Sequence, residues 1–270
     1  MPRSRRAPAA SALERACISW GCPVLLALCC AIASAAPADP KYGPAGAPIA
    51  VPLSQDHDYL RAPGHPAPDF WRLNSFYVPQ MNEYSCSAAA VSMVLNALLN
   101  TSPGRGAQDR NITQTDLIAK VAGDWQALLS PGGLRGRHGL TLPQLEAFLR
   151  AGLANYSRAK FAVQKHEATA SGAEGLQAWR AALTQNEKDP DDLIIVHFVQ
   201  DDLTSDKGGP FAHISPVGAY DEARRRVLVF DVDRDWYEPY WVPDAALLNA
   251  MAHETAAFGR GGYIRVSPVP

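Results

Sequence analysis

The chain has 270 residues, of which 47% are hydrophobic and 19% charged, and its formal net charge at pH 7 is -2. This globular mixture can bury one core and a small second unit, and it excludes collagen-like, coiled-coil and wholly disordered chains. The charge gives no electrostatic basis for binding nucleic acid or an anionic membrane. We therefore expect a globular protein with neither partner.

The first residues have the pattern of an export signal. An apolar run over residues 22–33 follows a basic start, and Ala33-Ser34-Ala35 fits the small-residue cleavage rule. The run is too short for a membrane span. We predict a signal peptide over residues 1–35 and export to the periplasm or the outside, with Sec and twin-arginine routes both open. The basic start is formed by Arg3, Arg5, Arg6 and Arg15.

Removal of this signal would leave Cys86 as the only one of the five cysteines. No disulfide within the chain is then possible, although an exported protein could form one. A lone thiol also excludes a thiolate metal site, so we predict no metal ligands. An unpaired exported cysteine is either a reactive group or a small buried apolar side chain, and both readings stay open here.

The mature chain divides into a leader and one domain. Residues 36–68 are rich in Pro, Ala and Gly, which predicts an extended leader without a core of its own. The globular domain is expected over residues 69–270.

Helix signals dominate the first half of this domain. Ser85 can cap a helix that runs to about Asn100, and a second helix opens at residues 113–116 and reaches Leu128. Two capping boxes follow. The first box is Thr141 with Gln144, in a helix ended by Gly152, and the second is Ser171 with Glu174, before Trp179.

Strand signals come later. The apolar run Leu193–Val199 predicts a strand buried on both faces. Residues 211–220 and 226–233 flank a polar segment and predict a hairpin, and residues 262–266 predict a final strand. Helices followed by a mostly antiparallel sheet indicate the α+β class.

Cys86 is the candidate nucleophile. It would lie in the first turn of the most apolar helix, where unpaired amides and a partial positive charge favour a thiolate. A nucleophile of this kind needs a base, and the base needs a group that orients it.

The predicted hairpin selects the base. A turn centred on Glu222 would set His213 directly opposite Asp231, with Cβ atoms about 5 Å apart. Asp231 also interrupts an apolar stretch, where a carboxylate is costly without a partner. The alternative is a buried carboxylate that holds a loop. His197, inside an apolar strand, fits a core histidine better.

Four segments now resemble one known family. The segment Gln80-Met-Asn-Glu-Tyr-Ser-Cys86 and the helix after it resemble the nucleophile helix of phytochelatin synthases, which are papain-like cysteine peptidases. Residues 211–220 resemble the family's histidine strand, residues 231–243 its aspartate strand, and residues 137–145 one of its helix starts. The resemblance covers roughly residues 69–267 and implies the papain-like fold.

The resemblance implies roles for these residues. Cys86 would cleave the Cys–Gly bond of glutathione, releasing glycine and leaving a γ-glutamylcysteinyl thioester for water or a second glutathione. His213 would act as base and then acid, and Asp231 would fix its tautomer. Gln80 matches the oxyanion-hole glutamine, a contribution of about 3 kcal/mol.

Substrate contacts follow from the same resemblance. Arg234 and Arg260 match arginines that contact the substrate, Glu254 would face its α-amino group, and Tyr237 is carried over with them. The alternative for both arginines is a solvated surface charge.

The chain also departs from the family pattern. Trp236 stands where the family often has a basic residue and Glu238 where it often has Pro, so the acyl-acceptor side can differ. We expect no counterpart of the cysteine-rich C-terminal region that is linked to metal activation in the plant and yeast enzymes. No cofactor is expected to be required, while stimulation by Cd or Zn ions or their thiolates, and a homodimer, stay open.

Two other functions remain. A broader papain-like peptidase or amidase is one, although Arg234, Arg260 and Glu254 favour a small charged substrate. A non-catalytic exported thiol protein that senses metal or oxidant is the other. A lone sulfur chelates poorly, and that function leaves Gln80 and the His213–Asp231 pairing unexplained.

Overall fold

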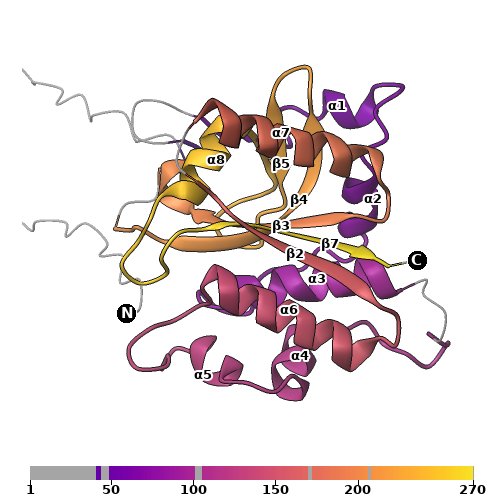
Figure 1. The fold of residues 1–270 in the computed structure, drawn as a ribbon, viewed down its shortest axis with the longest axis vertical. Coiled ribbons are helices and arrows are strands. Elements are labelled where there is room, and N and C mark those ends of the chain that lie inside the picture. Colours follow the sequence, from indigo (N-terminus) through magenta and orange to yellow (C-terminus); the bar gives the residue numbers. More distant parts are fainter. Residues whose placement is uncertain (1–40, 44–48, 101–104, 170–171, 206–207, 270) are drawn as a thin grey trace, which may run out of the picture. The chain divides into compact units, whose positions relative to one another are not determined.

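The computed structural model describes residues 41–43, 49–100, 105–169, 172–205 and 208–269. The predicted signal peptide and Ser171 lie outside these ranges. In the unit Asp39–Pro270, the described strands form one seven-stranded antiparallel sheet of order β1-β6-β5-β4-β3-β7-β2 (Figure 1). The predicted antiparallel sheet and the mixture of helices and strands are confirmed.

Each element has the following bounds. The strands are β1 (Val51–Pro52), β2 (Phe161–Glu167), β3 (Leu193–Val199), β4 (Ala212–Asp221), β5 (Arg226–Val229), β6 (Tyr240–Pro243) and β7 (Gly262–Pro268). The helices are α1 (Asp58–Arg61), α2 (Pro68–Asn74), α3 (Cys86–Leu99), α4 (Gln114–Lys120), α5 (Trp125–Leu128), α6 (Leu142–Tyr156), α7 (Ala173–Lys188) and α8 (Asp244–Ala252), with the short 3-10 helix η1 (Gln200–Asp202).

Helices cover both faces of the sheet. In Figure 1, α3, α4 and α6 lie on one side of the strands, and α7 and α8 lie on the other. Strand β3 separates the two cores, since Leu193 and Ile195 belong to the first, and Ile194 and Val196 to the second. All of β3 is buried, which confirms the predicted strand with two covered faces.

Helix α3 starts at Cys86, as predicted, and every residue in it is buried. Ser85 occupies the N-cap position, but its hydroxyl does not cap the helix. Instead it donates to the Asn82 carbonyl at 3.1 Å and accepts from the Asn82 N–H at 3.0 Å. The first-turn N–H groups of α3 therefore donate no hydrogen bond to the Ser85 side chain.

The other helices differ from prediction where glycine intervenes. The second predicted helix is divided into α4 and α5, with Gly123 between them at φ 141°. Helix α6 has the predicted capping box but continues past Gly152, where a Cβ would lie 2.9 Å from a Leu95 methyl group. Gly152 thus lets α6 approach α3 rather than ending the helix. The N-cap of α7 is Gly172.

The β4–β5 hairpin forms, but its predicted register is wrong. Tyr220 pairs with Val227 and Asp221 with Arg226, so the turn is centred later than Glu222. A bulge between Val217 and Ala219 then shifts the register, and β5 ends at Val229. Asp231 therefore lies beyond the ladder instead of opposite His213 within it.

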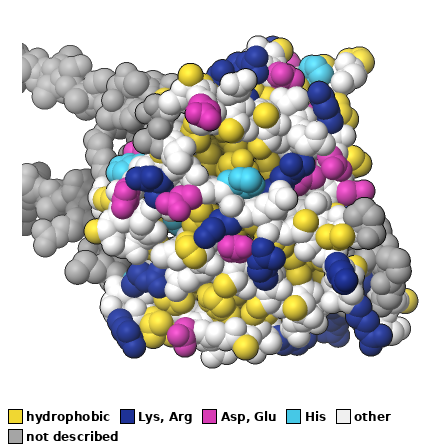
Figure 2. All heavy atoms as spheres, in the orientation of Figure 1, with side chains coloured by type: hydrophobic (Ala, Val, Ile, Leu, Met, Phe, Trp, Pro, Cys, Tyr) yellow, Lys and Arg dark blue, Asp and Glu magenta, His cyan; other side chains and the backbone are white. Residues whose placement is uncertain are grey.

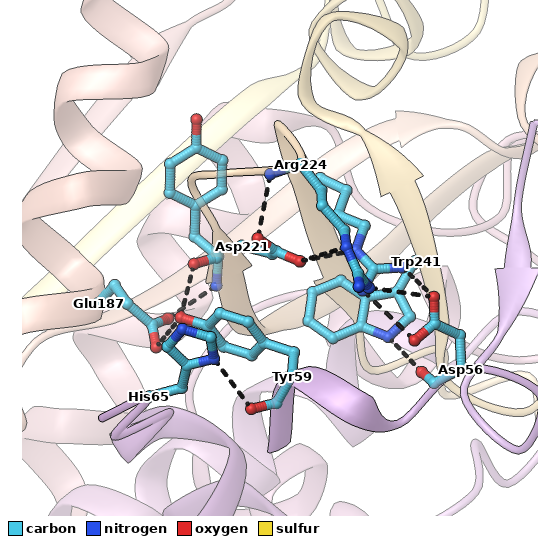
Figure 3. Close-up of polar contacts among 9 residues, drawn as sticks. Asp56, Tyr59, His65, Glu187, Asp221, Arg224 and Trp241 are labelled. Atoms are coloured by element: carbon cyan, nitrogen blue, oxygen red, sulfur yellow. Dashed lines mark hydrogen bonds and ion pairs between the residues drawn. The ribbon is translucent and has the colours of Figure 1, made fainter. Parts of the chain in front are cut away.

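Part of the predicted leader belongs to the fold. Strand β1 pairs with β6 at the sheet edge, where Pro52 is tolerated. The buried Tyr59 hydroxyl contacts Glu187 and the Tyr220 carbonyl at 2.9 Å each, and Trp241 donates to the Asp56 carbonyl at 2.8 Å (Figure 3). The predicted domain start at Asp69 is therefore too late.

The surface gives two further observations. Basic and acidic side chains are interspersed over the face shown in Figure 2. Among the residues described, no helix has both the length and the apolar character needed to cross a bilayer.

Gly218 at the β4 bulge provides a test of this packing. A Cβ there would lie 2.5 Å from the fully buried Phe230 ring. We expect Gly218→Ala to lower the free energy of unfolding by about 1–3 kcal/mol, as overpacking of a core does. Gly132→Ala, where the nearest atom is 3.8 Å away, is the control. Urea unfolding measures both, and equal stability of the two variants would contradict the expectation.

Candidate active site

The candidate nucleophile lies at a helix start. Cys86 is the first residue of α3, its thiol is free, and only 7% of the residue is exposed. The preceding turn is fixed by Asn82, whose side chain accepts from the Tyr84 N–H at 2.9 Å and donates to the Leu129 carbonyl at 3.2 Å. The sulfur is thus held at the positive end of a helix of 14 residues.

His213 on β4 is the imidazole of this site. Its Nε2 lies 2.9 Å from Asp231 Oδ1, and the Ser215 hydroxyl lies 3.1 Å from the same nitrogen. The Phe198 ring packs against the imidazole at 5.6 Å and nearly perpendicular to it. The Cys86 side chain is near enough to His213 to influence the charge of its ring.

The protonation of His213 reflects these neighbours. Burial opposes the charged ring, but the charge of Asp231 and its hydrogen bond outweigh burial, and Cys86 adds to the same effect. The pKa of His213 is therefore held well above its ordinary value. This arrangement favours an imidazolium beside the sulfur.

Asp231 is fully buried, and both of its carboxylate oxygens accept hydrogen bonds. Oδ1 accepts from the Asp233 N–H at 2.8 Å as well as from His213, and Oδ2 accepts from Gln200 Nε2 at 3.1 Å. Burial would raise the pKa of Asp231, but the charge of His213 and its hydrogen bond keep that pKa below its ordinary value. The carboxylate therefore stays ionised beside the imidazole.

Hydrogen bonds hold the backbone at Gln80 next to the His213–Asp231 pair. Its N–H donates to the carbonyl of Val232, the residue after Asp231, at 2.8 Å. The Gln114 side chain holds both flanking residues, since it donates to the Pro79 carbonyl at 2.7 Å and accepts from the Met81 N–H at 3.1 Å. Gln80 Oε1 is buried with no hydrogen-bond partner among the described residues, so its amide is not engaged in holding the fold.

The predicted substrate residues fall into two pairs. Arg234 is exposed, and its guanidinium lies 4.5 Å from the centre of the Tyr77 ring. Tyr237 is buried against Tyr42 and Tyr240, with ring centres 5.6 and 6.2 Å apart. Both residues lie in the segment after Asp231 and contact aromatic rings. The sequence alone did not reveal these ring contacts.

Arg260 and Glu254 form the second pair. They are joined by an ion pair of 3.0 Å at one end of β7, and the turn between them carries Phe258. The Phe258 ring packs against His197 at 6.2 Å, one residue before Phe198, which contacts His213. The turn therefore lies beside the strand next to the imidazole.

A sequence comparison assigns the family. A family model described as phytochelatin synthase matches residues 58–262. The chain belongs to the phytochelatin synthase family. Phytochelatin synthase membership was expected from the four segments quoted above, and it is confirmed.

Two curated relatives come from Lotus japonicus. Glutathione gamma-glutamylcysteinyltransferase 3 is 28% identical over 206 residues, which cover 73% of this chain and 37% of that protein. Glutathione gamma-glutamylcysteinyltransferase 1 is 26% identical over 206 residues, covering 73% of this chain and 36% of that protein. The chain thus spans little more than a third of the length of these two relatives.

Several residues of the site were missed in the sequence. Gln200 and Gln114 are buried and hold Asp231 and the Gln80 backbone, and the hydroxyl of Tyr77 donates to the Asp231 carbonyl. Gln200 is the first residue after the apolar strand β3, and its polar side chain at that place is the one signal that could have found it. Within the described ranges, no group of three His, Cys, Asp or Glu side chains could hold a metal ion.

His197 is buried with a pKa lowered to about 4 by burial, so it is the neutral core histidine expected.

The His213–Asp231 pair predicts a titration. Folding raises the pKa of His213, so the stabilisation it supplies is complete below the unfolded value of about 6.5 and is lost as pH rises through the folded value. Asp231→Asn removes the opposing charge and should lower the pKa of His213. NMR titration of the ring, assigned with His213→Ala, measures this shift. Identical titrations of wild type and Asp231→Asn would contradict it.

Proposed function

We propose that the protein is a glutathione γ-glutamylcysteinyltransferase or hydrolase of papain-like mechanism, with Cys86 as nucleophile. The observation that carries the proposal is the buried ion pair of His213 and Asp231, with the Cys86 thiol at a helix start near the ring. Family membership supports glutathione as the substrate class, because the relatives are named for it.

The proposed reaction begins at the Cys–Gly bond of glutathione. The Cys86 sulfur, having passed its proton to His213, attacks the carbonyl carbon, and the C–N bond breaks as His213 returns that proton to the glycine amine. A γ-glutamylcysteinyl thioester remains on Cys86. Water or the amine of a second glutathione then attacks this thioester while His213 accepts a proton, and the thiolate leaves.

Gln80 is proposed to stabilise the oxyanion of each tetrahedral intermediate. The side-chain amide and the Cys86 N–H would together donate to the developing charge, a contribution of about 3 kcal/mol. Support comes from the clamped Gln80 backbone and from its buried, unpartnered Oε1. Rotation of the amide exchanges its oxygen and nitrogen positions, so Nε2 can occupy that place.

Arg260 and Glu254 are proposed to bind the α-amino acid end of the γ-glutamyl group. Arg260 lines a cavity of about 360 Å³ together with the start of α6, Lys165 and Phe258. This volume is in the range of small-molecule sites. Arg260 in this cavity would bind the α-carboxylate, and Glu254, joined to Arg260 by the ion pair of 3.0 Å, would bind the α-amino group.

Further proposals concern the setting of the reaction. We propose that the protein acts after export, outside the cytoplasm, and that no cofactor is required. Cadmium or zinc thiolates would act as substrates or stimulants rather than as resident groups. Arg234 and Tyr237 are proposed for the acceptor side, where the exposed Trp236 gives an apolar surface.

Incubation with glutathione tests the reaction directly. Mass spectrometry of the products, with and without Cd²⁺, should detect free glycine and γ-glutamylcysteine, and products longer than glutathione would establish transfer. Cys86→Ser is expected to abolish turnover, because it removes the nucleophile. Cysteinylglycine as product would mean cleavage at the other amide bond, and this would contradict the proposal.

Arg260→Ala tests the substrate contact. Because this interaction would be made equally in the ground and transition states, we expect KM to rise about tenfold to a hundredfold with kcat little changed. Steady-state kinetics with glutathione measures both constants. Arg158→Ala, an exposed arginine just after α6, is the matched control. A fall in kcat at constant KM would contradict a binding role for Arg260.

A further inference from the structure

A short segment upstream of the family match contacts the surroundings of Asp231. Residues 41–43, here named the upstream segment, precede the matched region of residues 58–262. The segment makes hydrogen bonds to two different loops. Each of these loops supplies a donor to the Asp231 carboxylate.

The first loop contains η1 and Ser205. The Ser205 N–H donates to the Lys41 carbonyl at 3.5 Å, and its hydroxyl donates to the Gly43 carbonyl. In the same loop, Gln200 donates to Asp231 Oδ2, and its own carbonyl accepts from Thr204 at 3.0 Å. The upstream segment is therefore attached to the loop that holds one carboxylate oxygen.

The second loop runs from Asp233 to the start of β6. Tyr42 Oη accepts from the Glu238 N–H at 3.2 Å, and the Tyr42 ring meets the Tyr237 and Tyr240 rings edge-on at 5.6 and 5.9 Å. The Tyr237 N–H donates to the Asp233 carbonyl at 2.8 Å, and Asp233 in turn donates to Asp231 Oδ1. The same segment thus reaches the loop that holds the other oxygen.

We propose that Tyr42 is a positioning residue for Asp231, acting by joining the loop of Gln200 to the loop of Asp233. This proposal rests on the catalytic role proposed for Asp231. The three-ring cluster of Tyr42, Tyr237 and Tyr240 packs the second loop, and the backbone of the upstream segment attaches the first. Movement of the first loop away from the carboxylate would break the hydrogen bonds of Ser205 to the upstream segment. Movement of the second loop would break its contacts with Tyr42.

The charges around the carboxylate agree with this role. Its titratable neighbours are His213 on β4, Tyr240 on β6, Tyr77 before α3, and Tyr42. Burial raises the pKa of Tyr42, and the charges of Glu238 and Asp231 add to the rise, so its ring stays neutral. A neutral ring adds packing without competing for the His213 proton.

Alkylation of Cys86 by iodoacetamide, followed across pH by mass spectrometry, tests the proposal without glutathione. In Tyr42→Ala we expect Asp231 to be held less firmly, so that it stabilises the charged form of the His213 ring less. We expect the pH profile of alkylation to move upward by about one pH unit, so that the rate on its rising limb falls about tenfold. Tyr42→Phe keeps the ring and should restore most of the rate.

Tyr156→Ala is the matched control, since both tyrosines are half-buried and each ring faces a lysine. Lys41 Nζ lies 5.9 Å from the centre of the Tyr42 ring, and Lys120 Nζ lies 5.5 Å from the centre of the Tyr156 ring. Thermal unfolding of every variant separates a local effect from loss of the fold. If Tyr42→Ala does not fold, Ser205→Ala takes its place and should shift the profile in the same direction. An unchanged profile in the folded variant, or an equal shift in Tyr156→Ala, would overturn the proposal.

The glutathione assay and this comparison have separate outcomes. Wild type that fails to cleave glutathione would contradict the proposed function, while the alkylation profiles still decide the role of Tyr42.

Discussion

The site depends on one buried ion pair, between the His213 ring and the Asp231 carboxylate. Removing two charges from water is costly, and a buried pair persists only where geometry and further hydrogen bonds compensate for lost hydration. Here Asp231 receives donors from His213, Asp233 and Gln200, so that both oxygens are satisfied. An imidazole held in this way can keep its proton while a sulfur nearby gives one up.

The fold assembles this pair from distant parts of the chain. Strand β4 carries His213, the segment after β5 carries Asp231, and α3 brings Cys86 from the opposite half of the sequence. The bulge beside Gly218 and the Phe230 ring packed on it set where the chain leaves the ladder, so that Asp231 is directed at the imidazole. Packing in the core thereby determines geometry at the site.

Local signals predicted much of the fold. The capping box at Thr141, the apolar run of β3 and the start of α3 at Cys86 each depend on neighbouring residues, and the structure agrees with them. The contact of His213 with Asp231 was predicted from a wrong register, because chemistry required a partner for the carboxylate while the bulge was invisible in the sequence.

The remainder required tertiary information. Gln200 and Gln114 act on residues more than thirty positions away, and no periodic pattern marks such contacts. The segment around Tyr59 resembled a linker in composition, yet it gains a strand partner and buried hydrogen bonds only in the folded chain. Arg260 and Glu254 were chosen by resemblance, and their mutual ion pair follows from the turn that joins them.

Whether the buried ion pair activates Cys86 is the most direct question about this site. The rate of Cys86 alkylation by iodoacetamide at pH 7, compared between wild type and Asp231→Asn, answers it. The account predicts that Asp231→Asn is alkylated at least about tenfold more slowly, because the imidazolium beside the sulfur loses its opposing charge. Equal rates in the two proteins would contradict it.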